Sequence, residues 1–275
     1  NDPSPPQVLA GAGAGLVFEK PSVRTRNSME MAVVQLGGHP VSIRGDEVGI
    51  DARETAEDLI RVLAGYYKVV ALRVFDHKVL DRMVAQAVVP VVNLLSDEAH
   101  PMQALADLMT IHQEFGRFED VTLTYVGDAN NVWRSLALAC AMVGINSRVA
   151  CPPDFAPSET DLDRIRSLGG RVTVFDRPLE AVDGADVVYT DVWTSMGQEA
   201  EGESRRRAFE GFTVNEQLLG GMADNGVFLH CLPAHRGEEV ADDAIESDRS
   251  RVFRQAENRM HVARGLLAWL LQDTP

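Results

Sequence analysis

The chain has 275 residues, of which 45% are apolar and 24% charged, a composition typical of folded globular proteins. Its 26 basic residues are outnumbered by 41 acidic ones, and the resulting formal charge of -15 repels nucleic acid and anionic lipid. No apolar run approaches the roughly 18 residues that a membrane-spanning helix needs. We therefore expect no nucleic-acid partner and no membrane partner.

The cysteines Cys140, Cys151 and Cys231 are too few and too widely spaced for a disulfide framework, and no C-x-x-C pair indicates structural zinc. Three widely spaced cysteines without a disulfide framework fit a reducing compartment, so we expect a cytoplasmic protein. Residues 1–6 lack the basic segment and apolar run of a secretory signal. Cys140 lies in an apolar stretch and is predicted to be a core residue.

Short apolar, β-branched runs alternate with longer stretches of helical periodicity. The strands that these runs predict cover residues 15–18, 68–73, 89–94, 121–126, 147–150, 171–175, 186–189 and 226–230. Between the first two, Met29, Ala32, Val33 and Leu36 share one face of a predicted helix. Such alternation is typical of an α/β fold with parallel sheets.

An interruption after the predicted helix at residues 101–115 divides the chain into two α/β series. The segment GRFED at residues 116–120 breaks the apolar pattern before the second series begins. We therefore predict two doubly wound parallel-sheet lobes, joined by this helix and separated by a central cleft. Ligands of such sheets bind beyond the carboxyl ends of the strands, so polar side chains there are the candidate site residues.

The first such segment reads KPSVRTR at residues 20–26. Ser22 precedes a helix, whose free N-H groups favour an anion, and Arg24 adds a donor fork suited to phosphate. Arg26 lies on another helix face, so we expect it to have a structural partner. The alternative is an ordinary N-cap serine followed by solvated arginines, and the sequence leaves both open.

Arg73 ends the next strand, and His100 and Gln103 lie at the start of the joining helix. Pro101 favours the first helical position, so the helix dipole disfavours a proton on the His100 ring. Gln103 shares that helix face and can orient a carbonyl group. A capping histidine is more often structural than catalytic, but Ser22 and Arg73 favour a catalytic role here.

In the second series, the segment GDANN at residues 127–131 lacks the three-glycine spacing of a dinucleotide site, so a nicotinamide cofactor is disfavoured. Asn131 has donors and acceptors that suit an amino acid, although it can also cap the helix that we predict over residues 132–143. Asp191 ends another strand. The acidic loop from Asp191 to Glu203 either closes over a cationic substrate or is simply solvated.

Cys231 follows the last predicted strand. With His230 or His235 as a base it would be a nucleophile, but strand alternation directs His230 to the opposite side and no third orienting group is evident. The spacing of His230, Cys231 and His235 is also too irregular for a zinc site. We expect no covalent catalysis, and a cysteine that merely packs at a strand end is the alternative.

Five motifs together resemble the ornithine carbamoyltransferase family, within the aspartate/ornithine carbamoyltransferases. They are FEKPSVRTR at residues 18–26, HPMQ at 100–103, DVWTSMG at 191–197, HCLPA at 230–234 and ENRMH at 257–261. The resemblance implies transfer of the carbamoyl group of carbamoyl phosphate to the side-chain amine of L-ornithine, which gives L-citrulline and phosphate in arginine biosynthesis. It also implies a homotrimer with active sites near subunit interfaces and no metal or organic cofactor.

By this resemblance, residues 1–114 and a C-terminal helix that returns to them, within 256–275, bind carbamoyl phosphate, and residues 115–255 bind ornithine. The residues implied for carbamoyl phosphate are Ser22, Val23, Arg24, Thr25, Arg73, His100, Gln103, Cys231, Leu232 and Arg259. The residues implied for ornithine are Asn131, Asp191, Ser195 and Met196. The implied catalytic residues are Arg73, His100, Asp191 and Cys231.

Three features depart from the family pattern. Val23 stands where a threonine is common, which removes one hydroxyl contact to phosphate. Gly49 stands where a glutamine is often found, in a loop that in many relatives reaches a neighbouring subunit. The usual N-terminal helices are missing, so we expect the C-terminal helix to expose apolar side chains. These are Leu266, Leu267, Trp269 and Leu270.

Other functions remain open. The acceptor could be another amine, such as acetylornithine or putrescine, although the SMG motif at residues 195–197 favours ornithine. A catalytically silent binding protein would be indicated by loss of Arg24, His100 or Cys231, and all three are present. A nicotinamide-dependent dehydrogenase is opposed by the missing glycine fingerprint.

Overall fold

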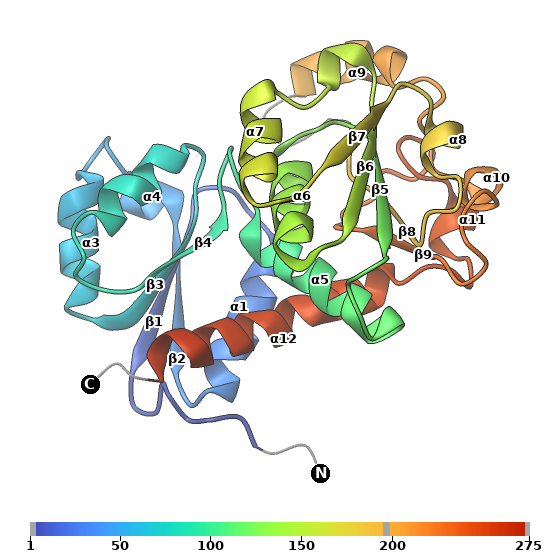
Figure 1. The fold of residues 1–275 in the computed structure, drawn as a ribbon. Helices are drawn as coiled ribbons and strands as arrows, with labels where there is room; N and C mark the ends of the chain where they lie inside the picture. Colours follow the sequence, from blue (N-terminus) through green and yellow to red (C-terminus); the bar gives the residue numbers. More distant parts are fainter. Residues whose placement is uncertain (1–3, 195–198, 273–275) are drawn as a thin grey trace. The chain divides into compact units, whose positions relative to one another are not determined.

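The computed structural model describes residues 4–194 and 199–272, and its contacts divide the chain into two compact units. The first unit comprises Asn1–Met102 and Glu257–Pro275, and the second comprises Gln103–Ala256. Figure 1 labels the helices and strands of both. The chain passes between the units within α5 (Pro101–Phe115) and α12 (Val252–Leu271). Among the described helices, none is both long enough and apolar enough to cross a membrane.

The first unit is built on a parallel sheet with the strand order β2-β1-β3-β4. The strands are β1 (Gly13–Phe18), β2 (His39–Arg44), β3 (Tyr67–Arg73) and β4 (Val91–Leu95). The helices between them are α1 (Val23–Gln35), α2 (Gly45–Val48), α3 (Ala56–Ala64) and α4 (His77–Val84). In β3, Val69 and Ala71 face a core shared with α1 and α12, whereas Val70 and Leu72 face one shared with α3 and α4. Helices therefore cover both faces of this sheet.

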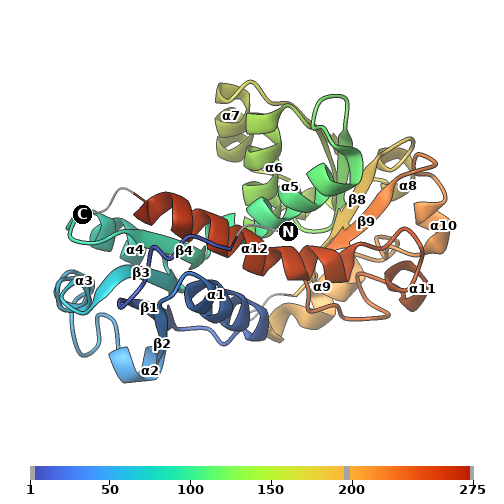
Figure 2. The same ribbon diagram turned by 90° about the horizontal axis from the view of Figure 1, so that it is seen from below.

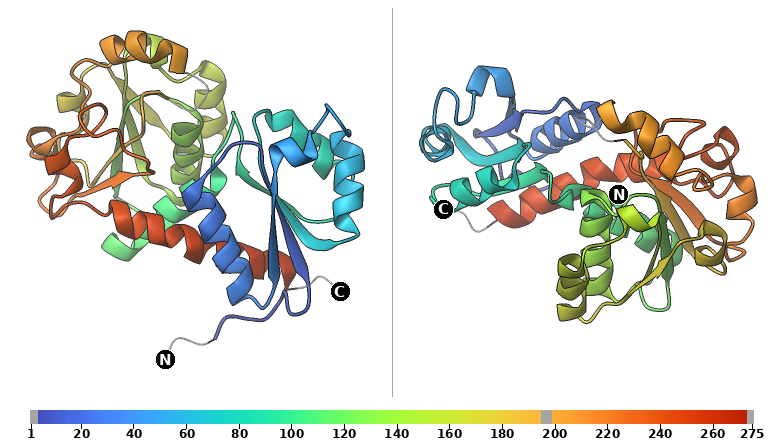
Figure 3. Two further views of the ribbon diagram at one scale, coloured as in Figure 1. Left: turned by 180° about the vertical axis from the view of Figure 1, so that it is seen from behind. Right: turned by 90° about the horizontal axis from the view of Figure 1, so that it is seen from above.

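Helix α12 returns to the first unit and packs beside α1, as Figures 2 and 3 show. Its buried residues Ala263, Leu267 and Leu271 recur every four positions, so they lie on one face of the helix. The expectation that Leu267 would be exposed is therefore wrong. Trp269, two positions further along the helix, is 71% exposed, as the sequence predicted.

The second unit is built on a parallel sheet with the strand order β7-β6-β5-β8-β9. The strands are β5 (Thr122–Val126), β6 (Asn146–Ala150), β7 (Val172–Phe175), β8 (Val187–Thr190) and β9 (Val227–His230). The α-helices that follow α5 are α6 (Asn131–Val143), α7 (Glu159–Ser167), α8 (Pro178–Ala181), α9 (Gly202–Ala208), α10 (Glu216–Leu219) and α11 (Asp242–Ile245). Short 3-10 turns occur at η1 (Pro153–Phe155) and η2 (Glu199–Glu201).

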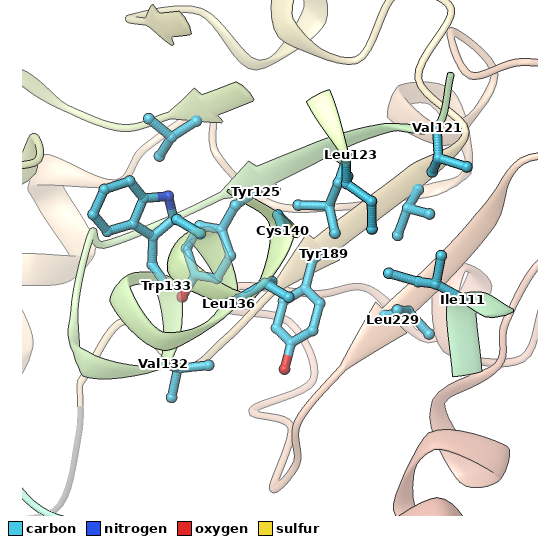
Figure 4. Close-up of a cluster of buried hydrophobic side chains, with 14 of the residues drawn as sticks. Ile111, Val121, Leu123, Tyr125, Val132, Trp133, Leu136, Cys140, Tyr189 and Leu229 are labelled. Atoms are coloured by element: carbon cyan, nitrogen blue, oxygen red, sulfur yellow. The ribbon is translucent and has the colours of Figure 1, made fainter. Parts of the chain in front are cut away.

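Two apolar cores lie on opposite faces of this second sheet. The core shown in Figure 4 packs α5, α6 and α7 against the sheet, and Trp133 and Tyr125 are among its largest buried side chains. The other core packs α8, α10, α11 and the aromatic residues that follow α9 against the opposite face. Cys140 is fully buried in the first of these cores, which confirms its prediction as a core residue.

Every strand predicted from the sequence is present, and both sheets are parallel as expected. The sequence missed β2, an edge strand that begins His39-Pro40 and has no fully buried residue. Its weak apolar signal and its proline explain the omission. The predicted lobe boundary at residue 114 falls in the last turn of α5, whereas the contacts divide the chain at the start of that helix.

The strand order reverses once in each sheet, between β1 and β3 in the first unit and between β5 and β8 in the second, and we call each of these places a switch point. In the first unit, the chain leaves β1 for one edge of the sheet and later returns to β3 on the other side of β1. In the second, β5 is followed by β6 on one side and eventually by β8 on the other. The loops after β1 and β3, and those after β5 and β8, therefore diverge and leave room for a ligand. Ser22 lies in the first of these loops and Asp191 in the last, and Arg24, Thr25 and Asn131 lie in the first turns of the helices that follow.

Candidate active site

The start of α1 presents free backbone donors at the switch point of the first unit. Ser22 caps this helix, and its Oγ accepts a hydrogen bond from the Thr25 N-H at 3.3 Å. The first turn of α1 holds no acidic side chain that would neutralise the positive helix end. Val23 is 75% exposed there, and Arg26 pairs with Glu30 at 2.8 Å, which is the structural partner expected for it. This helix end is suited to an anion.

A buried hydrogen bond brings the last helix to the start of the first. Arg259 Nη2 on α12 donates to Thr25 Oγ1 on α1 at 2.9 Å, and both side chains are buried. Because Thr25 accepts this bond, its own hydroxyl proton can be donated elsewhere. Arg264 Nη1 donates to Gln35 Oε1 at 2.9 Å and also joins the two helices. Arg259 is therefore held at the N-terminus of α1 by contacts within the first unit.

His100 is buried close to several arginines. Burial holds the pKa of His100 well below its usual 6.5, and the charges of Arg259, Arg73 and Arg24 lower that pKa further. The imidazole is therefore neutral at pH 7. The sequence attributed this neutrality to the helix dipole, whereas the structure gives burial and the arginines as its causes. With a neutral imidazole, the cluster of Arg24, Arg73, Arg259 and His100 is strongly cationic.

The depressed pKa of His100 predicts a pH dependence of stability. Below about pH 6.5 the unfolded chain binds a proton at His100 that the folded chain does not, so stability falls as pH decreases. A His100→Gln variant lacks this contribution. From pH 6.5 to pH 5.5, the unfolding free energy of the native protein should therefore fall by about 1 kcal/mol more than that of the variant. Urea unfolding at both pH values tests this, and a constant difference would contradict it.

Asp191 is the centre of a hydrogen-bonded cluster at the switch point of the second unit. Its Oδ1 accepts bonds from Cys231 Sγ and from the Val192 N-H, both at 2.8 Å. Asp191 is 5% exposed and Cys231 is 8% exposed. Since the thiol of Cys231 donates its proton to Asp191, it is not the thiolate that a nucleophile requires. This geometry supports the expectation of a non-covalent mechanism.

Asn130, the neighbour of the predicted Asn131, contacts Asp191. Asn130 Oδ1 caps α6 by accepting bonds from the Val132 N-H at 2.8 Å and the Trp133 N-H at 3.2 Å. Its Nδ2 donates to Asp191 Oδ2 at 3.1 Å. The predicted alternative, that Asn131 caps the helix, is therefore wrong, because α6 begins one residue earlier than expected. Asn131 is the first helical residue and is half-buried.

His230 is held away from any role as a base for Cys231. Its Nδ1 accepts a bond from the Leu232 N-H at 2.9 Å, so the ring proton lies on Nε2, which donates to Glu239 Oε1 at 3.1 Å. Both ring nitrogens are thus engaged by groups other than the Cys231 thiol. Leu232 has a φ of 57° and precedes a cis bond to Pro233. The positive φ of Leu232 lies in the left-handed region, which is uncommon for a leucine.

Gln103 belongs to a buried polar network that the sequence did not reveal. Its Nε2 donates to Asp107 Oδ1 at 2.8 Å, and Gln255 Nε2 donates to the same oxygen at 2.7 Å. Gln255 Oε1 in turn accepts a bond from the His230 N-H at 2.9 Å. Gln103, Asp107 and Gln255 are all buried. Asp107 thereby connects α5, α12 and the end of β9, where Cys231 follows.

Removal of the shared acceptor in this network should destabilise the protein. Asp107→Leu leaves two buried amide donors without their acceptor, at an expected cost of about 3 kcal/mol in unfolding free energy. Asp107→Asn keeps an oxygen at the Oδ1 position and should cost about 1 kcal/mol. Urea unfolding of both variants compares the two losses. Equal losses would contradict the assignment of Oδ1 as the shared acceptor.

The structure brings the predicted residues together as two sets. In the first unit, Arg73, His100 and Arg259 gather near the Ser22 cap of α1. In the second unit, Asp191 and Cys231 are in direct contact. Ser195 and Met196 lie outside the described residues.

A possible metal-binding group consists of His235, Glu238 and Glu239, whose ligand atoms lie within 4.8 Å of one another. Glu238 pairs with Arg206 at 3.2 Å, and Glu239 Oε1 accepts a bond from the His235 N-H at 2.6 Å. These contacts already give the carboxylates structural partners. We therefore assign the group to the support of the segment that follows β9.

Comparison with known proteins matches almost the whole chain to one family. The carbamoyl-P binding domain of aspartate/ornithine carbamoyltransferase matches residues 2–113, and its Asp/Orn binding domain matches residues 119–270.

The chain belongs to the aspartate/ornithine carbamoyltransferase family.

Relatives within this family are similar over most of their length. An ornithine carbamoyltransferase of Acidothermus cellulolyticus is 50% identical, with 93% of this chain and 83% of the relative covered. One of Haloquadratum walsbyi is 47% identical, with 96% and 87% covered. The solved ornithine carbamoyltransferase of Pyrococcus furiosus is 43% identical, has a TM-score of 0.94, and is matched over 98% of this chain and 88% of that one.

The Gly49 departure from the usual carbamoyltransferase pattern has a local cause. Gly49 ends the short helix α2 with a φ of 60°, in the left-handed region that favours glycine. A Cβ at this position would lie 2.8 Å from Cγ of Arg53. A glutamine would therefore be strained unless this turn were rebuilt. Glycine at position 49 therefore fits the left-handed backbone conformation that ends α2.

Proposed function

We propose that the protein transfers the carbamoyl group of carbamoyl phosphate to the side-chain amine of L-ornithine, producing L-citrulline and phosphate for arginine biosynthesis. One observation carries the proposal: a buried cationic cluster at one switch point and a buried carboxylate cluster at the other occur in the same chain. A cationic cluster suits a phosphate-bearing donor, and a carboxylate suits a substrate with an amine. Relatives named ornithine carbamoyltransferase, at up to 50% identity, add support.

In this proposal, residues 1–114 with 256–275 bind carbamoyl phosphate. The phosphate is held by Ser22, by the Val23 N-H, and by Arg24 and Thr25. Arg73, His100 and Gln103 address the carbamoyl group, and Arg259 supports the site through its bond to Thr25. The supporting observations are the cap at Ser22 and the cationic surroundings of His100.

Residues 115–255 bind ornithine in the same proposal. The residues assigned to ornithine are Asn131, Asp191, Ser195 and Met196, and Cys231 and Leu232 contact both substrates. We add Asn130 to this set because its Nδ2 fixes the Asp191 carboxylate at 3.1 Å.

The chemistry follows from these assignments. The neutral amine of ornithine attacks the carbamoyl carbon, and negative charge develops on the carbamoyl oxygen. Thr25, Arg73 and His100 supply donors for that oxygen, each worth about 3 kcal/mol of transition-state stabilisation. Asp191 and Cys231 hold the amine. The C–O bond to phosphate then breaks, and the departing phosphate accepts the amine proton.

We also propose that the protein is a cytoplasmic homotrimer, on the basis of the family resemblance. Each chain has a mass of 30.1 kDa, so sedimentation equilibrium should give three times that mass. A monomer or dimer mass that persists in the presence of carbamoyl phosphate would contradict the trimer.

The identity of the acceptor amine needs a separate test. A solved N-acetyl-L-ornithine transcarbamylase has a TM-score of 0.87 with this chain but only 28% identity, so fold alone does not separate the acceptors. A colorimetric ureido-product assay with carbamoyl phosphate and ornithine, N-acetylornithine or putrescine tests the choice. We expect product with ornithine. Product only with another amine would replace the acceptor, and product with none would favour a silent binding protein.

A further inference from the structure

Arg205 is a buried arginine on the short helix α9. Its side chain is only 7% exposed, whereas the side chains of the adjacent Arg206 and Arg207 are 55% and 75% exposed. Arg207 forms a surface ion pair with Glu203 at 3.2 Å. A guanidinium is rarely buried without specific partners, so Arg205 requires a separate explanation.

The partners of Arg205 lie in two loops at the switch point of the second unit. Its Nη2 pairs with the Asp128 carboxylate, in the loop after β5. Its Nε donates to the backbone carbonyl of Trp193, in the segment after β8. The face of the guanidinium lies 4.7 Å from the centre of the Phe155 ring, a cation-π geometry. A weaker 3.4 Å contact joins Arg205 to Glu201.

Both loops carry the residues that surround the Asp191 carboxylate. Asp128 is two residues before Asn130, and Trp193 is two residues after Asp191. Asn130 and Asp191 meet in a 3.1 Å hydrogen bond. Arg205 therefore joins the two loops through Asp128 and the Trp193 carbonyl. The hydrogen bond between Asn130 and Asp191 joins the same two loops a second time.

We propose that Arg205 is a positioning residue for the acceptor amine, because it fixes the spacing between the loop of Asn130 and the loop of Asp191. The inference rests on the proposed function, in which these loops bind ornithine. Arg205 acts through Asp128 and the Trp193 carbonyl. Its planar fork reaches both acceptors at once, which the single ammonium of a lysine cannot do with the same geometry. The charge of the pair also matters, since burial raises the pKa of Asp128 and Arg205 opposes that rise.

The test compares Arg205→Ala and Arg205→Lys with the matched surface variant Arg207→Ala. We expect Arg205→Ala to raise KM for ornithine roughly ten- to a hundredfold, because small displacements of positioning groups have effects of this size. KM for carbamoyl phosphate should stay within about twofold. The ornithine KM of Arg205→Lys should lie between those of Arg205→Ala and the native protein. The ornithine KM of Arg207→Ala should equal that of the native protein. Millimolar methylguanidine should partly restore the ornithine KM of Arg205→Ala, which a general structural defect would not allow.

Two further measurements keep the test decisive if Arg205→Ala folds poorly. Urea unfolding and carbamoyl phosphate binding by calorimetry report the folded fraction. Asp128→Asn, which retains Arg205 and its bond to Trp193, should raise the ornithine KM several-fold by weakening the charged pair. If Arg205→Lys and Asp128→Asn both keep native ornithine KM values, or if both substrates and kcat are affected equally, Arg205 is not a positioning residue. If the native protein and Arg207→Ala neither bind ornithine nor form citrulline, the proposed function fails and the inference fails with it.

Discussion

The Arg24→Ala variant is expected to lose about a thousandfold in kcat/KM for carbamoyl phosphate, equivalent to about 4 kcal/mol of transition-state stabilisation. Arg24 lies in the first turn of α1, next to the Ser22 cap, and its charge acts on the buried His100 ring. Its removal takes a donor fork from the proposed phosphate site. Initial rates at varied carbamoyl phosphate and saturating ornithine measure the effect.

Arg26→Ala is the matched control for this loss. Arg26 is two residues further along the same helix, is 57% exposed, and pairs with Glu30. An exposed i,i+4 pair contributes only about 0.3–0.5 kcal/mol, so this variant should retain nearly full activity. Native kinetics for Arg24→Ala, or equal losses in the two variants, would remove Arg24 from the phosphate site.

The Asp191→Asn variant is expected to lose about a thousandfold in kcat/KM for ornithine, because the amide replaces a buried carboxylate by a neutral group. The amide also replaces one carboxylate oxygen by an N-H donor, which then faces either Cys231 or Asn130, and both of these already donate to Asp191. Carbamoyl phosphate affinity should change much less, since its phosphate is assigned to Ser22, Val23, Arg24 and Thr25 in the first unit. Initial-rate kinetics and calorimetry measure the two quantities separately.

Asp186→Asn provides a control on the neighbouring part of the chain. Asp186 precedes β8, at the opposite end of that strand from Asp191, and its carboxylate accepts a bond from the Thr122 N-H at 2.8 Å. This substitution should lower stability slightly without changing the ornithine KM. If Asp186→Asn and Asp191→Asn have the same kinetic effect, the carboxylate of Asp191 has no specific role.

The fold was predictable where burial is complete. β8 and β9 are fully buried strands, and their residues form continuous apolar or β-branched runs that the sequence displays directly. β2 was not predictable by the same reasoning, because an edge strand with half-exposed residues has no such run. Leu267 was misjudged because its burial depends on which face of α12 meets the sheet, which is a tertiary property.

The candidate site was predictable where a residue's role follows from its local position. Ser22 caps a helix and Asp191 follows a strand, and both positions can be identified in the sequence. Asn130 was missed because two adjacent asparagines differ only in where the helix begins. Asp107 and Arg205 were missed because each has a decisive partner far along the chain: 148 residues separate Asp107 from Gln255, and 77 separate Arg205 from Asp128.

The most direct test of the account follows the transferred group itself. The protein is incubated with carbamoyl phosphate labelled with carbon-13 at the carbonyl and with unlabelled ornithine, and the products are followed by NMR. The account predicts a labelled ureido carbon in citrulline, formed in equal amount to the phosphate released and absent without ornithine. Release of phosphate without a labelled ureido product, or no reaction of either kind, would contradict it.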